Sequence, residues 1–343
     1  MFNKPALRNA TLSMFALICV VGPSGSAGAK PGKITRFDVP GASGTVGDGI
    51  NDKGAITGSW FDQTGAGHGF VRAANGKVTK FDVSGATDTV PVSIDAGGII
   101  AGYYQNEDGV DLGFVRAADG TITTFDVSGY TAAVYPAGIN SAGVLAGSYQ
   151  DGISWQGFLR VSNGALTTFE PTSSTSTIVA GINNNGVVAG YYAGTDDEYH
   201  GFVRSGDGSL KTFDPAGSID TFAFGINAKG VIAGRFVDSG GVNHGFVKSP
   251  GGNFTTFDAP KAGTADGQGT VANSINRAGT VAGIYVDGKY VQHGLVRFAD
   301  GKIKSFDPTG STCTFAAGIN ASGKITGYWL DSRGIAHGFE RSN

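Results

Sequence analysis

Four short motifs recur in the same order along almost the whole chain, and this repetition limits the possible folds more than any other feature. Phenylalanine followed by an acid recurs in register at seven positions, separated five times by 44 residues and once by 49. An isoleucine before Asn or Asp, a glycine after Ala or Thr, and a Gly-Phe pair keep the same register, except that Leu295 replaces the phenylalanine once. The acid-linked phenylalanines are Phe37, Phe81, Phe125, Phe169, Phe213, Phe257 and Phe306. Such a period is typical of an architecture in which each repeat is one supersecondary unit.

Each repeat predicts four short antiparallel strands. The first two strands are joined by Asn-x-x-Gly, as at Asn51 to Gly54, and the last two by Asn-Gly, Asp-Gly or Gly-Gly, as at Asp207-Gly208. Four strands per 44 residues is the arithmetic of a β-propeller blade. We therefore predict an all-β fold over residues 30–343, a seven-bladed β-propeller of four-stranded repeats. The N-terminal strand, 34–38, is predicted to complete the last blade and close the ring.

The repeat consensus resembles a known family. It reads Gly-Ile-Asn-x-x-Gly-x-Ala-Gly-x-Tyr, then His-Gly-Phe, then Thr-x-Phe-Asp. This pattern resembles the exported HAF-type repeat family of bacteria over essentially the whole mature chain, with His-Gly-Phe in place of His-Ala-Phe. The resemblance implies an exported repeat protein and no particular activity.

The composition agrees with a repeated β-fold and disfavours two other classes. Glycine accounts for 58 of the 343 residues, and glycine costs about 1 kcal/mol at each position in a helix interior. The formal net charge of −3 lacks the basic surplus of a nucleic-acid-binding protein. The chain is therefore not expected to be helical or to bind nucleic acid.

Residues 1–29 predict a secretory signal peptide. Lys4 and Arg8 precede an apolar run over 12–21, and 27–29 reads Ala-Gly-Ala, a small-x-small cleavage site after Ala29. The run is shorter than the ~20 residues of a transmembrane helix, and no membrane span is expected. After cleavage Cys313 would be the one remaining cysteine, which we expect to be buried, unpaired and unreactive. The predicted location is the periplasm or the outside of the cell.

All five histidines occupy one position of the repeat, directly before the Gly-Phe or Gly-Leu pair. They are His68, His200, His244, His293 and His337. Counting across the hairpin places His68 opposite Asp82 and His337 opposite Asp38. A ring of metal ligands is one interpretation, but histidines in one column of a ring lie too far apart to share an ion. We favour a structural role, in which each histidine is a hydrogen-bonding strut within its blade.

Two further columns are interpreted as structural. A basic residue follows two positions after the Gly-Phe aromatic in every repeat, as at Arg204, and predicts an ion pair within the blade or a solvated edge. An aromatic residue on the second strand, as at Phe236, shares a face with apolar residues and predicts packing against the next blade.

A ligand site is expected on the rim that carries the longer loops, because function tends to sit on variable loops. These loops are rich in acids near their beginnings, and the preceding strand carries a variable column that includes tyrosines. The candidate ligand-binding residues are Asp62, Tyr103, Asp151, Tyr191, Asp196, Asp197, Asp238, Asp287, Tyr328 and Asp331.

An acidic rim suits Ca²⁺, which takes oxygen ligands, but no loop matches Asp-x-[Asp/Asn]-x-[Asp/Asn]-Gly. We therefore predict no metal ligand and no cofactor. No nucleophile elbow, Walker loop, His-Glu-x-x-His or Cys-x-x-Cys motif occurs, and no catalytic residue is predicted.

The preferred function is that of an exported, non-catalytic binding or scaffold protein. It would act as a monomer and recognise an extracellular ligand or protein, carbohydrate included, through the loop rim. Two alternatives stay open: a lectin or carbohydrate-active enzyme of the cell envelope, and a structural component of a surface layer or matrix.

Overall fold

The computed structural model describes residues 32–127 and 133–342, and this part of the chain is all-β. The predicted signal peptide lies outside the described residues. The strands in chain order are β1 (Ile34–Phe37), β2 (Gly44–Ile50), β3 (Ile56–Phe61), β4 (Gly67–Arg72), β5 (Val78–Phe81), β6 (Asp88–Ile94), β7 (Ile100–Gln105), β8 (Asp111–Arg116), β9 (Ile122–Phe125), β10 (Val134–Ile139), β11 (Leu145–Gln150), β12 (Trp155–Arg160), β13 (Leu166–Phe169), β14 (Ser174–Ile182), β15 (Val188–Gly194), β16 (Tyr199–Arg204), β17 (Leu210–Phe213), β18 (Asp220–Ile226), β19 (Ile232–Val237), β20 (Asn243–Lys248), β21 (Phe254–Phe257), β22 (Gly269–Ile275), β23 (Val281–Val286), β24 (Gln292–Arg297), β25 (Ile303–Phe306), β26 (Cys313–Ile319), β27 (Ile325–Leu330) and β28 (Ala336–Arg341). The described residues contain no helix that could cross a membrane.

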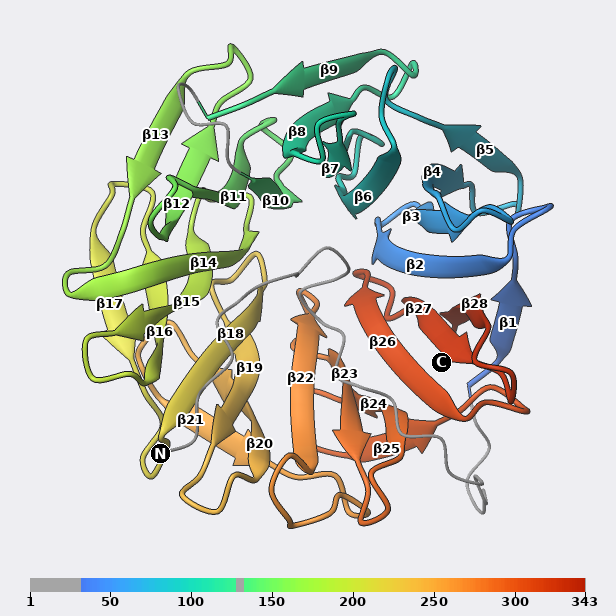
Figure 1. Ribbon diagram of the computed structural model, residues 1–343. Helices are drawn as coiled ribbons and strands as arrows, with labels where there is room; N and C mark the ends of the chain where they lie inside the picture. Colours follow the sequence, from blue (N-terminus) through green and yellow to red (C-terminus); the bar gives the residue numbers. More distant parts are fainter. Residues whose placement is uncertain (1–31, 128–132, 343) are drawn as a thin grey trace.

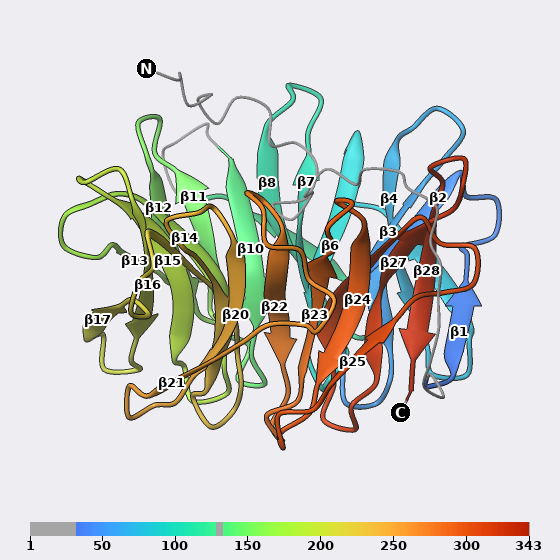
Figure 2. The same cartoon turned by 90° about the horizontal axis from the view of Figure 1, so that it is seen from below.

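The strands pair in antiparallel sets of four arranged around a central axis (Figure 1). In six sets the strands follow chain order, with the first nearest the axis and the fourth at the outer edge (Figure 1). Five sets are separate sheets, and two others are joined into one eight-stranded sheet through the single parallel pair of Asn243 and Gly269. In the side view the sets stand next to one another around the axis (Figure 2). The predicted all-β architecture of four-stranded repeats is therefore confirmed.

One set combines the two ends of the chain. Strand β1 pairs with β28 in an antiparallel register that matches Ile34 with Arg341 and Phe37 with Gly338. The backbone of Ser342 also donates to the carbonyl of Lys33 at 3.0 Å. The N-terminal strand thus occupies the outer position that β5 or β9 occupies in other sets.

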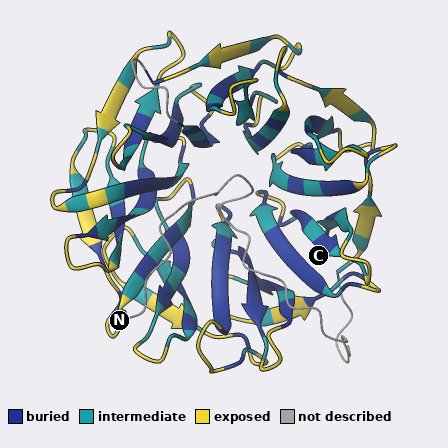
Figure 3. Cartoon of the chain, in the orientation of Figure 1, coloured by how far each residue is buried: buried dark blue, intermediate teal, exposed yellow. Residues whose placement is uncertain are grey.

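A column of phenylalanines on the third strands forms the centre of each interface between neighbouring sets. Six of these side chains have no exposed surface, and Leu295 has the same burial in the seventh set. The six are Phe70, Phe114, Phe158, Phe202, Phe246 and Phe339. Phe202 meets the ring of Phe169, from the preceding set, edge-on at 6.1 Å. The inner and middle strands are accordingly buried while the outer strands are exposed (Figure 3).

The basic column also belongs to these interfaces. Arg204 lies over the ring of Phe169 in the preceding set, with Cζ 5.1 Å from the ring centroid. The same contact is made by Arg72 over Phe37, Arg116 over Phe81, Arg160 over Phe125, Lys248 over Phe213, Arg297 over Phe257 and Arg341 over Phe306. The predicted ion pairs within a blade are therefore wrong for this column. A cation over an aromatic face stabilises the contact between two sets instead.

A belt of asparagines locks the sets to one another at the turns between first and second strands. Asn183 Oδ1 accepts from the amides of Asn185 and Val187, which closes its own turn. Its Nδ2 donates to the carbonyl of Asn227 in the next set at 3.0 Å. The same link joins Asn51 to Asp95, Asn140 to Asn183, Asn227 to Asn276, Asn276 to Asn320, and Asn320 to Asn51. The side chain of Asp95 has no N–H to donate, and it leaves the belt open at one junction, toward Asn140.

Closing this gap should stabilise the protein. Asp95→Asn supplies the missing donor toward the carbonyl of Asn140 and keeps the oxygen that accepts from Ile99. We expect a gain of about 0.5–1.5 kcal/mol in the free energy of unfolding, the net value of one hydrogen bond, measured by urea denaturation. The reverse change, Asn183→Asp, opens a second gap and should cost at least as much. Equal stability of Asp95→Asn and the parent would contradict the belt as a stabilising element.

Cys313 is buried, as predicted, with 2% of its surface exposed. It is disulfide-bonded in the full chain, whereas the unpaired thiol was predicted for the chain after cleavage and stays a prediction.

Candidate functional site

The acids at the start of the second loops shape the loops themselves. Asp238 Oδ1 accepts from the amides of Gly240 and Val242 at 2.8 and 2.9 Å. Asp62, Asp287 and Asp331 accept from the amides two and four positions on, while Asp151 accepts from Ile153 and Ser154. The Thr64 hydroxyl contributes most to lowering the pKa of Asp62 to about 2, and the Ile335 amide does the same for Asp331. These carboxylates are therefore ionised turn residues.

Each histidine of the repeat column lies between two carboxylates, one on the loop and one at the end of the outer strand. His200 Nδ1 is 2.9 Å from Asp214, at the end of the outer strand, and Nε2 is 3.2 Å from Asp196 on the loop. The expected contacts of His68 with Asp82 and of His337 with Asp38 are present at 3.0 and 2.9 Å. The corresponding pairs are His244 with Asp258 and His293 with Asp307. The structural role of the column stays a prediction, which this geometry supports.

The electrostatics of the histidines follow from the two acids. Burial alone would lower the pKa of His200, but the hydrogen bonds that its ring makes to Asp214 and Asp196 outweigh it and raise the pKa above its ordinary value. The same balance raises the pKa of His244 and of His293. Each ring also packs on an aromatic side chain of the second strand, as His293 does on Tyr285 at 4.8 Å.

One part of the rim brings three potential metal ligands together. Asp196, Glu198 and His200 present ligand atoms within 4.8 Å of one another. Asp196 already accepts from the amide of Glu198 and contacts His200 Nε2. Asp197 lies between them in the left-handed region, at φ 67°. The other candidate acids of the rim belong to separate sets, so the structure does not gather them into one site.

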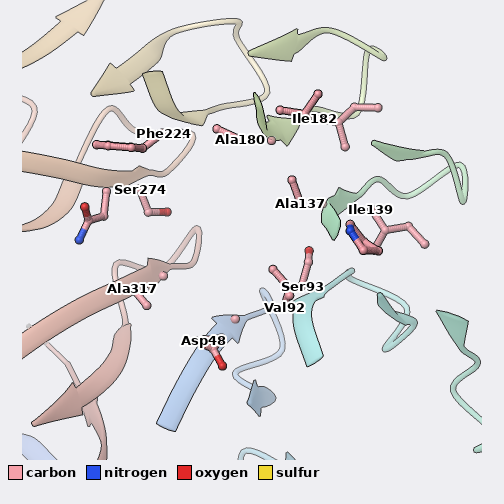
Figure 4. A pocket seen from close by; sticks show the side chains of 18 of the residues that line it. Asp48, Val92, Ser93, Ala137, Ile139, Ala180, Ile182, Phe224, Ser274 and Ala317 are labelled. Carbon is pink, nitrogen blue, oxygen red and sulfur yellow. The ribbon is translucent and has the colours of Figure 1, made fainter. Parts of the chain in front are cut away.

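A cavity of about 340 Å³ lies on the axis of the ring. Figure 4 shows its wall, built from the first strands of all sets together with parts of the second strands. Tyr103, Tyr191 and Tyr328, expected on the rim, line this cavity instead. The structure thus divides the candidate residues into loop acids and channel tyrosines.

A repeated β-bulge points one side chain per set toward the axis. In β2 the ladder pairs Gly47 with Gly58 and Gly49 with Thr57, which leaves Asp48 as the extra residue. The other first strands carry the same irregularity at the same place. The extra residues are Asp48, Val92, Ala137, Ala180, Phe224, Asn273 and Ala317, and all of them line the cavity. A bulge of this kind re-aims a side chain without ending the strand.

Asp48 distinguishes one sector of the cavity wall. It is the single carboxylic acid among the lining residues, and Figure 4 shows it near the end of β2, at the wall of the cavity. Burial raises the pKa of Asp48 to about 8. Tyr103 and Tyr328 are electrostatically coupled to it from the two neighbouring sets. Sequence analysis missed Asp48, although the variable position two residues before the repeated isoleucine marks it.

A second acid stands directly behind the wall. The hydroxyl of Tyr135, a lining residue, donates to Asp111 Oδ2 at 2.5 Å. Tyr135 also meets Tyr103 edge-on, with ring centroids 4.8 Å apart. Burial raises the pKa of Asp111, and the Tyr135 hydrogen bond partly opposes that shift. This pair fixes the orientation of one phenol in the cavity.

Four-stranded antiparallel sheets around a channel, with a ligand-sized cavity on its axis, define a β-propeller. No protein-family model and no curated protein matches the sequence. Among solved structures, streptogramin B lyase is similar with a TM-score of 0.60 and 13% identity, covering 91% of this chain and 98% of the lyase. The β-propeller domain of the Trilobed protease from Pyrococcus furiosus has a TM-score of 0.59 and 11% identity, covering 87% and 95%. These similarities establish the fold.

The comparisons also correct the functional prediction. Virginiamycin B lyase from Staphylococcus aureus, an enzyme, has a TM-score of 0.60 and 12% identity over 91% of this chain and 99% of its own. The non-catalytic binding or scaffold role was inferred from the regularity of the repeats and the absence of catalytic motifs. That inference is wrong, because propellers that match along the whole ring include enzymes. The same fold thus supplies no argument against catalysis.

Proposed function

We propose that the protein is an enzyme that acts on a small organic molecule held in the axial cavity, with Asp48 as the group that transfers a proton. The observation that carries the proposal is the position of Asp48. A single carboxyl group projects from a bulge into a cavity whose other extra residues are Val92, Ala137, Ala180, Phe224, Asn273 and Ala317. A pocket with a mostly apolar wall and few polar groups is the usual form of a small-molecule site.

The acid–base properties of Asp48 support this role. With a pKa of about 8, the carboxyl group is mostly protonated at neutral pH, and both of its protonation states are populated near pH 8. General acids and bases work best when their pKa lies close to the working pH. Asp48 can therefore donate a proton to a departing heteroatom or, once ionised, accept one from the substrate. The phenols of Tyr103 and Tyr328, from the two neighbouring sets, are electrostatically coupled to it.

A substitution at Asp48 tests the proposal. We expect Asp48→Asn to lower kcat/KM by about a hundredfold or more for any substrate found by screening small esters, amides and lactones. The pH profile of the parent should bend near 8. Asp238→Asn on the rim is the matched control and should keep the activity. Full activity of Asp48→Asn, or loss of activity in the rim control alone, would contradict the assignment.

We also infer that the ring has seven blades and is closed by the N-terminal strand. Seven bulged first strands, each followed by two or three consecutive partners, support this count. The pairing of β1 with β28 supports closure, because it supplies a fourth strand to β26–β28. The single parallel pair at Gly269 would then be a bridge between two adjacent blades.

The predicted secretion and the resemblance to the HAF-type repeats remain part of this proposal. An exported propeller would meet its substrate in the periplasm or outside the cell. N-terminal sequencing of the protein recovered from the exporting cell tests the predicted cleavage after Ala29.

A further inference from the structure

We propose that the axial cavity selects an organic cation, an amine or quaternary ammonium group on an apolar body, and that this group is held at the sector of Asp48. The inference rests on the proposed function, because it takes the same cavity as the substrate site and names the chemical class of the substrate.

The charge of the cavity wall is one-sided. No Lys, Arg or His lines the cavity within the described residues, whereas Asp48 does. Asp111 adds a second acid one hydrogen bond behind Tyr135. An anionic ligand would find no cationic partner in this wall and would face these carboxyl groups. A cation would find a carboxyl group with which it can pair directly.

Aromatic rings surround the same sector. Tyr328, which is electrostatically coupled to Asp48, stacks on Phe315 with ring centroids 5.3 Å apart, and both rings line the cavity. On the other side Tyr103 packs edge-on against Tyr135. The faces of aromatic rings attract cations, and several rings around one acid are the arrangement that recognises quaternary ammonium groups.

A buried cation coupled to one of the cavity tyrosines belongs to a different sector. Arg235, on β19, is electrostatically coupled to Tyr191 rather than to Asp48. Its Nη1 donates to Asn243 Oδ1 at 2.6 Å, and its Cζ lies 4.5 Å from the ring centroid of Phe222. Arg235 is not among the lining residues. It therefore disfavours a second cation near Tyr191 and leaves the Asp48 sector as the place for the charge.

Binding should be coupled to ionisation of Asp48. The titratable groups that face it are Tyr103 from β7 and Tyr328 from β27, and burial raises the pKa of both hydroxyls well above their ordinary value. These phenols stay neutral between pH 6 and 9, so Asp48 is the group that changes charge. A permanent cation favours the ionised carboxylate and displaces its proton.

Calorimetry with three probes of one shape tests the inference. The probes are benzyltrimethylammonium, its neutral carbon analogue and the anion phenylmethanesulfonate, titrated into the full chain at pH 6 and pH 9. We expect the cation to bind best and roughly a hundredfold more tightly at pH 9 than at pH 6, because an acid with a pKa near 8 is mostly ionised only at the higher pH. Asp48→Asn should remove the preference for the cation and its pH dependence, while Asp238→Asn should keep both.

The outcomes separate this inference from the proposed function. Equal binding of the neutral and cationic probes, or cation binding that survives in Asp48→Asn, would overturn the inference. Asp48-dependent turnover of neutral substrates would also overturn the inference, but this result would support the proposed enzymatic role. Asp48-dependent cation binding would support the inference even if no substrate were turned over. Tyr328→Leu removes one ring and no charge. This variant should bind the cation less tightly and keep the pH dependence of binding.

Discussion

Replacing Phe202 by alanine is expected to lower the free energy of unfolding by about 3–5 kcal/mol, the usual cost of removing a buried aromatic side chain. The ring has no exposed surface and lies edge-on to Phe169 of the neighbouring set. The ring also packs directly against the backbone of Gly190, where an added Cβ would lie only 2.8 Å from it. The space cannot close when the ring is removed, since the β-sheets on both sides are fixed by their ladders. Urea denaturation monitored by fluorescence measures the loss.

Two variants calibrate this prediction. Phe202→Leu should cost much less, because the protein itself places Leu295 at the equivalent position with the same burial. Ile153→Ala should cost almost nothing, because Ile153 is 94% exposed. A loss below 1 kcal/mol in Phe202→Ala would show that the interfaces between sets contribute less to stability than their burial indicates.

Asp48→Asn is expected to stabilise the protein at alkaline pH. The folded state raises the pKa of Asp48 from 3.8 to about 8, so the folded chain binds more protons than the unfolded chain between these values. Stability attributable to Asp48 therefore falls as pH rises from about 4 to about 8 and is constant above that range. The amide avoids this cost, and the variant should gain a few kcal/mol at pH 8, with about 5 as an upper bound.

Chemical denaturation of both proteins at a series of pH values from 4 to 9 measures the effect. The difference in stability should be small at pH 4 and grow to its full value near pH 8. Asp108→Asn, on an exposed loop, is the control and should show no growing difference. A difference that does not change with pH would mean that Asp48 is ionised throughout, and the proposed acid–base role would lose its support. A gain of this kind is typical of residues that are kept for activity at the expense of stability.

The four-stranded repeat could be predicted because each motif has a local physical reason. Asn183 closes a turn with its own side chain, and the glycine at 190 leaves room for the ring of Phe202. These requirements recur in every repeat, so the residues that meet them can be recognised in a single sequence. The register of the first strands was not predicted. The residue that bulges from β2, Asp48, is chosen by the hydrogen-bond ladder with β3, which a short alternating strand does not reveal.

The candidate site was predicted less well, for a geometric reason. Variation among repeats drew attention to Tyr103, Tyr191 and Tyr328, which line the cavity rather than the rim. Whether a variable side chain faces solvent or a common channel depends on how the sets are arranged around the axis, and no single repeat contains that information. The loop acids were selected by charge, although residues such as Asp238 are needed to close their own turns. The cation–aromatic contacts of Arg204 and its equivalents were missed because the partner belongs to another repeat.

The repeated bulge separates the part of the gene that must stay uniform from the part that is free to diverge. Paired residues of a first strand are constrained by the ladder and by the neighbouring set, but the extra residue has no partner in the ladder and lines the cavity. A codon change at one such position alters one part of the cavity wall and leaves the six other positions and the ladder intact. The copies have already diverged there, into an acid, an amide, an aromatic and small aliphatic side chains. A ring of this kind can therefore acquire new ligand preferences by single substitutions, each at a cost to folding that is confined to one repeat.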